Sequence, residues 1–312
     1  MTQNLSSIQW ESIPLDYVET WMPWFSIRIK VHAILHEEKT PFQNLKILET
    51  ELWTMMVLDN MIMLTVPQTW DDLISQEQIE IERPYHEFMV HPGLSVIPNA
   101  KKALIIWGGD GGMMKEILRY PSIEKAVLVE IDGCVVEAAK KYFPQVAQKI
   151  IDNDSRVEVR IEDGIKYVKN KKGKFDFITV DSTEPEVFDT DGAKVEWPAA
   201  VLFTDEFYLS VFEKLTHDGI AMFQSGSYIA HPEALKKMYE NIKKVFPHVY
   251  ILSVPPFATY PFWWTAIMAS KRYIPSGKVQ LPFDGKVLHF FNGDSTDTAI
   301  KSIPRNVIWG SV

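Results

Sequence analysis

The chain has 312 residues, of which 46% are hydrophobic and 23% are charged. This balance is typical of a globular enzyme and excludes disordered, collagen-like and disulfide-rich chains. The net charge of −9 argues against a nucleic-acid partner and allows cationic substrates. A single cysteine, Cys134, cannot form an internal disulfide, which suits the cytoplasm. We expect no secretory or membrane segment, because the start lacks a signal pattern and the apolar stretch 55–66 is short and interrupted.

The first part of the chain is predicted to be rich in β-strands. The strand candidates are 25–35, 44–49 and the two halves of 54–66, which can fold back at Asp59-Asn60. Residues 67–84 are polar and indicate a surface loop or short helix. We therefore expect a small N-terminal β-domain over residues 1–75.

From residue 101, apolar runs of strand length alternate with helical patterns. The expected strands are 103–107, 126–132, 157–161, 175–181 and 220–225, and the expected helices are 113–119, 133–142, 164–170, 203–215 and 232–245. This alternation indicates a parallel sheet covered on both faces. Strands 249–254 and 264–270 follow one another directly and indicate an antiparallel edge. We expect an α/β fold with a seven-stranded, class I methyltransferase-like (Rossmann-like) sheet over residues 76–312, including a C-terminal extension.

A glycine-rich turn, IIWGGDGGMMKEIL (105–118), stands between a strand and a helix. Ligands of open α/β sheets bind beyond the carboxyl ends of the strands, so this turn is a candidate binding site. It is not the dinucleotide fingerprint, because Met114 stands where the last glycine belongs. A tight turn without a ligand is the alternative interpretation.

Three acids make the turn more informative. Glu130 ends the next strand, where an acid commonly accepts hydrogen bonds from a ribose, and Asp163 follows a third strand, placed to meet an adenine amino group. Asp110 puts a negative charge in the turn itself. A ligand anion about 4 Å away would be repelled by about 4 kcal/mol, on the order of a thousandfold in affinity, so the nearby ligand end should be cationic. Alternatively, Asp110 turns outward or caps the following helix.

A second acidic motif, FDFITVDSTEP (175–185), places Asp181 at a strand end and Glu184 three residues later. Two carboxylates on one short loop can hold an ammonium group and accept a proton from it. The alternative is a Ser/Thr-Asp turn without chemistry.

These motifs together resemble the polyamine aminopropyltransferases, the spermidine synthase family, over about residues 15–273. The matching segments are HEEKTPFQ (36–43), YHE (85–87), WGGDGG (107–112), VEID (129–132), EDG (162–164), DSTEP (181–185), LFTDEFY (202–208), QSGS (224–227) and ATYP (258–261). The resemblance implies transfer of the aminopropyl group of decarboxylated S-adenosylmethionine, as co-substrate, to a di- or polyamine, with release of methylthioadenosine. Putrescine, giving spermidine, is the favoured acceptor.

The resemblance also implies roles for particular residues. Asp181 would take the proton and Tyr85 would orient the nucleophile. The nucleoside substrate would be bound by Gln43, Gly109, Asp110, Gly111, Glu130, Asp163, Gly164 and Pro198, and the amine by His86, Glu184, Gln224 and Tyr260. We expect a cytoplasmic homodimer or homotetramer with no prosthetic group, metal, nucleic-acid or membrane partner. Two alternatives stay open: an S-adenosylmethionine-dependent amine N-methyltransferase, and a non-catalytic polyamine- or nucleoside-binding paralogue.

The chain departs from the family pattern mainly around the acceptor. Trp107 replaces a glycine, Met63 replaces a glutamine and Glu184 replaces an aspartate. Extra residues fall near 66–80 and 186–195. The departures leave the acceptor open among putrescine, spermidine, agmatine, cadaverine and longer diamines. The aromatic run Phe262, Trp263 and Trp264 is interpreted as core, and the alternative is that its aromatic faces hold polyamine cations.

Overall fold

The computed structural model describes residues 15–67, 83–97, 99–170, 172–182, 187–188, 194–195, 204–254, 256, 262–273, 281–288 and 290–292. The predicted domain boundary at residue 75 lies outside these ranges and stays a prediction.

Five antiparallel strands, ordered as in the sequence, form the N-terminal sheet. They are β1 (Leu15–Met22), β2 (Phe25–Lys39), β3 (Asn44–Thr50), β4 (Trp53–Leu58) and β5 (Met61–Pro67). The predicted fold-back at Asp59-Asn60 is confirmed: Leu58 pairs with Met61, and the two turn residues have φ values of 45° and 66°. Positive φ at both positions is the geometry of the two-residue turn that matches strand twist.

A seven-stranded sheet forms the second part, and the predicted fold class is confirmed. Its strands are β6 (Lys102–Ile106), β7 (Lys125–Glu130), β8 (Val157–Ile161), β9 (Phe175–Val180), β12 (Leu215–Ser227), β13 (His248–Val254) and β14 (Trp264–Ser270), in the order β13-β14-β12-β9-β6-β7-β8. The ladders from β12 to β8 are parallel. β14 runs antiparallel to both neighbours, so the reversed strand lies one position inside the edge that β13 forms. A separate pair, β10 (Val187–Phe188) and β11 (Lys194–Val195), falls within the extra residues 186–195.

Helices cover both faces of the large sheet. They are α1 (Arg83–Leu94), α2 (Gly112–Ile117), α3 (Gly133–Tyr142), α4 (Gln148–Ile151), α5 (Gly164–Asn170), α6 (Asp205–Lys214) and α7 (Pro232–Val245), followed by the short 3-10 helix η4 (Gly285–Val287). One buried cluster joins α1 and α2 to the sheet, and a second joins α5, α6 and α7 to it. Helix α1 is not among the predicted helices, because Pro92 and Gly93 are poor helix formers and obscure its pattern.

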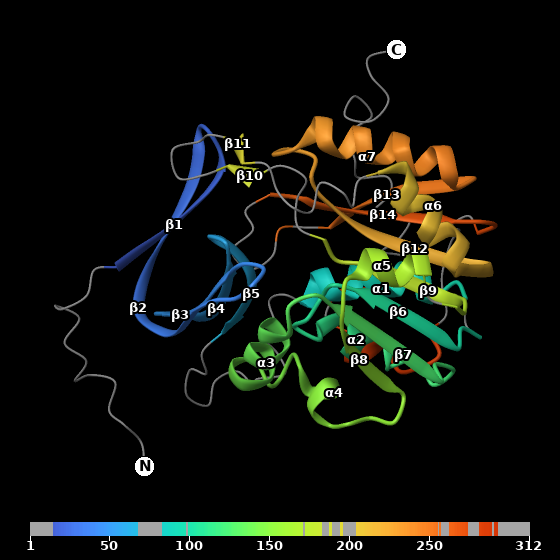
Figure 1. The fold of residues 1–312 in the computed structure, drawn as a ribbon, viewed down its shortest axis with the longest axis horizontal. Coiled ribbons are helices and arrows are strands. Elements are labelled where there is room, and N and C mark those ends of the chain that lie inside the picture. Colours follow the sequence, from blue (N-terminus) through green and yellow to red (C-terminus); the bar gives the residue numbers. More distant parts are fainter. Residues whose placement is uncertain are drawn as a thin grey trace.

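The two parts of the molecule share a third cluster. Val135, Ala139 and Phe143 on or beside α3 pack against Leu45 and Leu64 of the N-terminal sheet. Figure 1 shows that sheet in blue beside the α/β part, with α3 at the junction. The contact places the β2–β3 turn next to the end of β7, which bears on the site described below.

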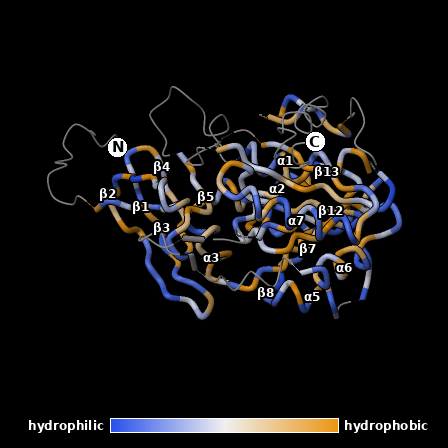
Figure 2. Tube along the Cα trace, turned by 90° about the horizontal axis from the view of Figure 1, so that it is seen from above, coloured by the Kyte–Doolittle hydropathy of each residue, from blue (hydrophilic) through white to orange (hydrophobic). Residues whose placement is uncertain are grey.

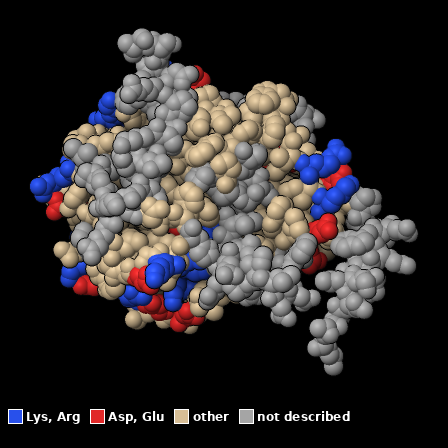
Figure 3. Space-filling model, turned by 180° about the vertical axis from the view of Figure 1, so that it is seen from behind, with Lys and Arg blue, Asp and Glu red and all other residues tan. Residues whose placement is uncertain are grey.

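Hydropathy and charge follow the same layering. Figure 2 shows hydrophobic stretches gathered in the interior and hydrophilic stretches along the outer loops. On the face drawn in Figure 3, Lys and Arg lie beside Asp and Glu rather than in patches of one sign. Of the helices that the structure describes, none combines the length and the apolar character that a membrane crossing requires.

Candidate active site

The site residues follow from the register of the parallel strands. Ile106 pairs with Val129 on one side and with Val180 on the other, and Val180 pairs with Phe223. The next residues along these four strands therefore line one edge of the sheet: Trp107, Glu130, Asp181 and Gln224. The chain connections change direction between β6 and β9, which is where open α/β sheets bind their ligands.

Two glycines of the predicted turn allow side chains to approach its backbone. A Cβ at Gly109 would lie 3.1 Å from the Glu130 Oε2 atom, and a Cβ at Gly112 would lie 2.2 Å from the His86 ring. Larger residues at these positions would push the carboxylate and the imidazole away. The turn thus gathers Glu130 and His86 around its backbone.

Asp110 faces inward from the same turn. Its Oδ1 accepts the backbone N–H of Gly112 at 2.7 Å, and its Oδ2 lies 3.4 Å from His86 Nε2. The two side chains are only 12% and 7% exposed. The alternative that Asp110 turns outward is wrong, whereas a bond to the start of α2 is present. Burial acts to raise the pKa of Asp110, but His86 and the Gly112 N–H outweigh it and lower the pKa below its usual value.

Asp181 lies across the edge from Asp110 and accepts a hydrogen bond from the Tyr85 hydroxyl at its Oδ1. Burial and the negative charge of Asp110 raise the pKa of Asp181 to about 7, against the opposing effects of Tyr85 and His86. Glu130 behaves similarly: burial, with smaller contributions from the Asp132 and Asp181 charges, raises its pKa to about 7. A buried carboxyl that titrates near neutrality beside another acid is typical of functional sites.

The N-terminal sheet also reaches this edge. Gln43 Nε2 donates to Asp132 Oδ2 at 2.9 Å, and the Thr40 hydroxyl donates to the same oxygen at 2.7 Å. The other oxygen of Asp132 caps α3 by accepting the Cys134 N–H. Sequence reasoning missed Asp132 as a site residue. An acid just before a helix start is the N-cap signal that could have found it.

Asp163 and Gly164 lie at the start of α5. The Asp163 Oδ1 accepts the backbone N–H groups of Ile165 at 2.9 Å and Lys166 at 3.2 Å, so this acid caps the helix. The Trp107 indole lies against Gly164, 3.6 Å from where a Cβ would be. Trp107 therefore forms a wall next to the residue pair that the resemblance assigns to the adenine.

The remaining predicted residues divide into three groups. Gln224 is buried and follows the β12 residue that pairs with Val180, so it lies beside Asp181. Pro198, Glu184 and Tyr260 lie outside the described residues. The aromatic-core interpretation is confirmed for Trp264, which packs edge-on against Trp21, but it is wrong for Trp263, which is exposed because it precedes β14.

Comparison with known proteins identifies the family. The sequence profile of the spermine/spermidine synthase domain matches residues 82–280, and that of the spermidine synthase tetramerisation domain matches residues 17–65. The polyamine aminopropyltransferase of Moorella thermoacetica is 38% identical over 83% of each chain. That of Bacillus subtilis is 37% identical over 84% of this chain and 86% of its own. The chain belongs to the spermine/spermidine synthase family.

Solved structures of the family agree with the fold. A crystal structure of spermidine synthase in complex with the transition state analogue AdoDATO has a TM-score of 0.80 at 30% identity, covering 97% of this chain and 98% of that one. Spermidine synthase from Thermotoga maritima gives a TM-score of 0.79 at 30% identity, covering 98% of each chain. This protein is thus a polyamine aminopropyltransferase, a transferase of polyamine biosynthesis. Among its described residues, no group of three or more His, Cys, Asp and Glu side chains is placed to hold a metal ion.

Proposed function

We propose that this aminopropyltransferase uses decarboxylated S-adenosylmethionine as donor and putrescine as acceptor, forming spermidine and releasing methylthioadenosine. The observation that supports this most directly is the buried pair Asp110 and Asp181 on either side of the switch point. Within the described ranges, no Lys or Arg forms an ion pair with either carboxylate; Asp110 faces His86, and Asp181 accepts from Tyr85. Their charge suits the ammonium end of the decarboxylated donor, and an intact carboxylate would be repelled by about 4 kcal/mol at about 4 Å.

The nucleoside would lie along the strand ends on the β6–β8 side. Glu130 would accept hydrogen bonds from the ribose, and Gly109 gives that carboxylate close access to the turn. Gln43, which donates to Asp132, would help to bind the nucleoside at this edge. The adenine would lie towards Gly164 and the Trp107 wall, together with Asp163, Gly111 and Pro198.

The chemical step is a displacement at carbon. The neutral amine nitrogen of the acceptor attacks the propyl carbon bonded to the sulfonium. The carbon–sulfur bond breaks, and its electron pair leaves with sulfur as neutral methylthioadenosine. Before the attack, the protonated acceptor amine would give up a proton to Asp181, and the product of the attack is a secondary ammonium ion. An aliphatic amine has a pKa near 10, so its neutral form is only about one part in a thousand at pH 7, a cost of about 4 kcal/mol that a nearby base reduces.

The acceptor would enter from the α1 side of the edge. Tyr85 would orient the attacking nitrogen through its hydrogen bond to Asp181, and His86 and Gln224 would line the path with Glu184 and Tyr260. The carboxylates of Asp110, Asp181 and Glu184 would hold the two cationic substrates side by side. This placement would account for much of the catalysis, because it keeps the reacting atoms at attack distance.

A two-arm assay tests the proposal. The purified enzyme is incubated with either decarboxylated or intact S-adenosylmethionine and with putrescine, cadaverine, agmatine or spermidine, and the products are identified by mass. We expect spermidine from the decarboxylated arm with putrescine as the most rapidly used amine. Preference for another amine would overturn the acceptor, and methylated amines from the intact arm would overturn the donor.

We also propose that the N-terminal sheet joins copies of the chain into a homodimer or homotetramer. Residues 17–65 match a tetramerisation domain, and this sheet exposes large apolar side chains, among them Trp24 at 74%. The others are Leu15, Ile34, Leu35, Phe42 and Leu52. Analytical ultracentrifugation should give a mass of two or four chains, and a monomer at micromolar concentration would contradict the proposal.

A further inference from the structure

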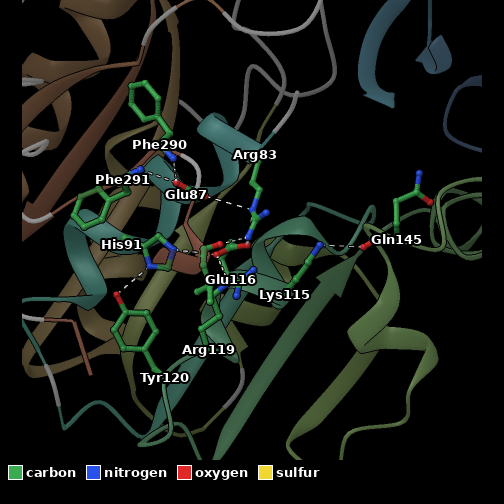
Figure 4. A network of polar contacts seen from close by, with 11 residues as sticks. Arg83, Glu87, His91, Lys115, Glu116, Arg119, Tyr120, Gln145, Phe290 and Phe291 are labelled. Carbon is green, nitrogen blue, oxygen red and sulfur yellow. Dashed lines mark hydrogen bonds and ion pairs between the residues drawn. The ribbon is translucent and has the colours of Figure 1, made fainter. Parts of the chain in front are cut away.

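Helix α1, which carries Tyr85 and His86, is held on another face by a separate buried network (Figure 4). Arg83, Glu87 and His91 recur every fourth residue and therefore share that face. The Glu87 side chain is 0% exposed, and its Oε1 lies 3.4 Å from Arg83 Nε. A buried carboxylate of this kind is retained only where it is fully paired.

The second oxygen of Glu87 binds the C-terminal segment 281–292. It accepts the backbone N–H groups of Phe290 at 2.8 Å and Phe291 at 2.6 Å, while Arg83 donates to the Val287 carbonyl. Both phenylalanine rings also pack on Phe88, with centroids 5.2 Å and 6.2 Å away. The segment begins beyond residue 280, where the match to the family domain ends. Charge-assisted hydrogen bonds and ring packing therefore bind this segment to α1.

The same network ties α1 to α2. His91 lies 3.0 Å from Glu116 Oε2 and 3.0 Å from the Tyr120 hydroxyl, and Arg119 donates to Glu116 at 2.6 Å. Helix α2 begins directly after the turn that carries Asp110. Helix α1 presents Tyr85 and His86 to the two carboxylates of the site, and α2 presents the Gly112 N–H to Asp110. The network therefore joins the two helices that contact these carboxylates.

We propose that Glu87 is a positioning residue of the transferase: by holding Arg83 and the 281–292 segment, it fixes the rotation of α1 that directs the Tyr85 hydroxyl to Asp181. Tyr85 and Glu87 are two residues apart, which places them on roughly opposite faces of a helix with 3.6 residues per turn. A rotation of α1 that loosens one contact therefore displaces the other. The inference rests on the roles proposed above for Tyr85 and Asp181.

The first test compares Glu87→Gln with a control from the segment itself. Glutamine keeps the size of the side chain but loses the charge that faces Arg83. We expect kcat to fall by about 10- to 100-fold, as for other residues that orient a functional group, while the Kd of methylthioadenosine changes by less than about twofold. Lys286→Ala, at an exposed position in η4, should leave both quantities unchanged. A Glu87→Gln enzyme with undiminished kcat would overturn the inference.

A double-mutant cycle with Tyr85→Phe separates positioning from a general loss of structure. If Glu87 acts through Tyr85, Glu87→Gln should lower kcat by less than about threefold once the Tyr85 hydroxyl is absent. Effects that multiply would overturn the inference. If Tyr85→Phe alone lowers kcat and Glu87→Gln does not, only the positioning role fails. If Tyr85→Phe alone has no effect, the proposed role of Tyr85 fails with it.

Phe290→Ala provides a second variant in case Glu87→Gln does not fold. It keeps the backbone N–H that Glu87 binds and removes only the ring that packs on Phe88. We expect kcat to fall by about 3- to 10-fold, with the same loss of effect in the Tyr85→Phe background. Unchanged kcat, or an effect that multiplies with Tyr85→Phe, would count against the inference.

Discussion

Two groups of buried carboxylates, one on α1 and α2 and the other at the edge of the large sheet, differ in their partners. Glu116 contacts His91 and Arg119, and Glu87 contacts Arg83 and two backbone N–H groups. In the other group, made of Glu130 and Asp181, no Lys or Arg forms an ion pair, as far as the structure describes the chain, and the neighbouring Asp110 faces His86.

The pKa values follow this pairing. Burial acts to raise the pKa of Glu116, but His91 and Arg119 outweigh it and lower the pKa to about 2. Burial dominates at Asp181 and Glu130, and the pKa of each is raised to about 7. The first group is neutralised within the fold and stabilises it. The second group is not neutralised by a described Lys or Arg, which is what the proposed binding of cationic substrates requires.

The largest effect should come from removal of Asp181, the acid that takes the proton in the proposed mechanism. Asp181→Asn keeps an acceptor for Tyr85 but cannot take a proton, so aminopropyl transfer should fall by about 100- to 10,000-fold. Methylthioadenosine binding, measured by calorimetry, should change little. Asp176→Asn is the matched control, since Asp176 lies at the opposite end of the same strand. Transfer by Asp181→Asn within about tenfold of the parent would remove Asp181 from its role.

Replacement of Glu116 should instead affect stability. Its folded pKa of about 2 lies below the unfolded value, so Glu116 stabilises the fold above about pH 4.5 and loses this contribution as pH falls towards 2. Glu116→Gln should therefore lower the free energy of unfolding at pH 7 by about 3 kcal/mol, measured by urea denaturation.

The ionised Asp181 side chain has the opposite effect on stability. Its folded pKa is raised, so its ionisation opposes folding, and stability falls as pH rises from about 4 through 7. Asp181→Asn should make the unliganded chain more stable at pH 8 by about 4 kcal/mol. If Glu116→Gln and Asp181→Asn changed the free energy of unfolding in the same direction, the distinction between the two groups would be contradicted.

Binding of a cationic donor should offset the negative charge of Asp181, and proton release on binding measures this. At pH 6.5 Asp181 is mostly protonated, and a cationic donor tail should lower its pKa and release roughly half a proton or more. Calorimetry in buffers of different ionisation enthalpy gives this number. Methylthioadenosine, which lacks the cationic tail, should release less, and Asp181→Asn should abolish the difference. Equal release by both ligands in the parent enzyme would indicate that the tail does not approach Asp181.

The site could be predicted from sequence where local pattern and sheet geometry suffice. Glu130 and Asp181 end apolar strands, and parallel strands bring their carboxyl ends to one edge. The contact of Gln43 with Asp132 joins residues 89 positions apart, and that of Glu87 with Phe291 spans 204. Each of these contacts depends on how separate elements pack, so local sequence periodicity does not predict it. The spacing of Arg83, Glu87 and His91 indicates a shared helix face but not its partner.

The smallest effect concerns the turn that carries Asp110. Trp107 has φ 59°, a left-handed conformation that is unfavourable for a bulky side chain, and its indole packs near Phe207 with centroids 6.4 Å apart. Trp107→Ala and Trp107→Gly lose the same packing, but glycine tolerates positive φ, so the glycine variant should be more stable than the alanine variant by about 1 kcal/mol. Thermal unfolding of the two variants measures this difference. If alanine is the more stable, the backbone of the turn relaxes when the indole is removed, and the packing of Trp107 then holds the left-handed conformation at residue 107.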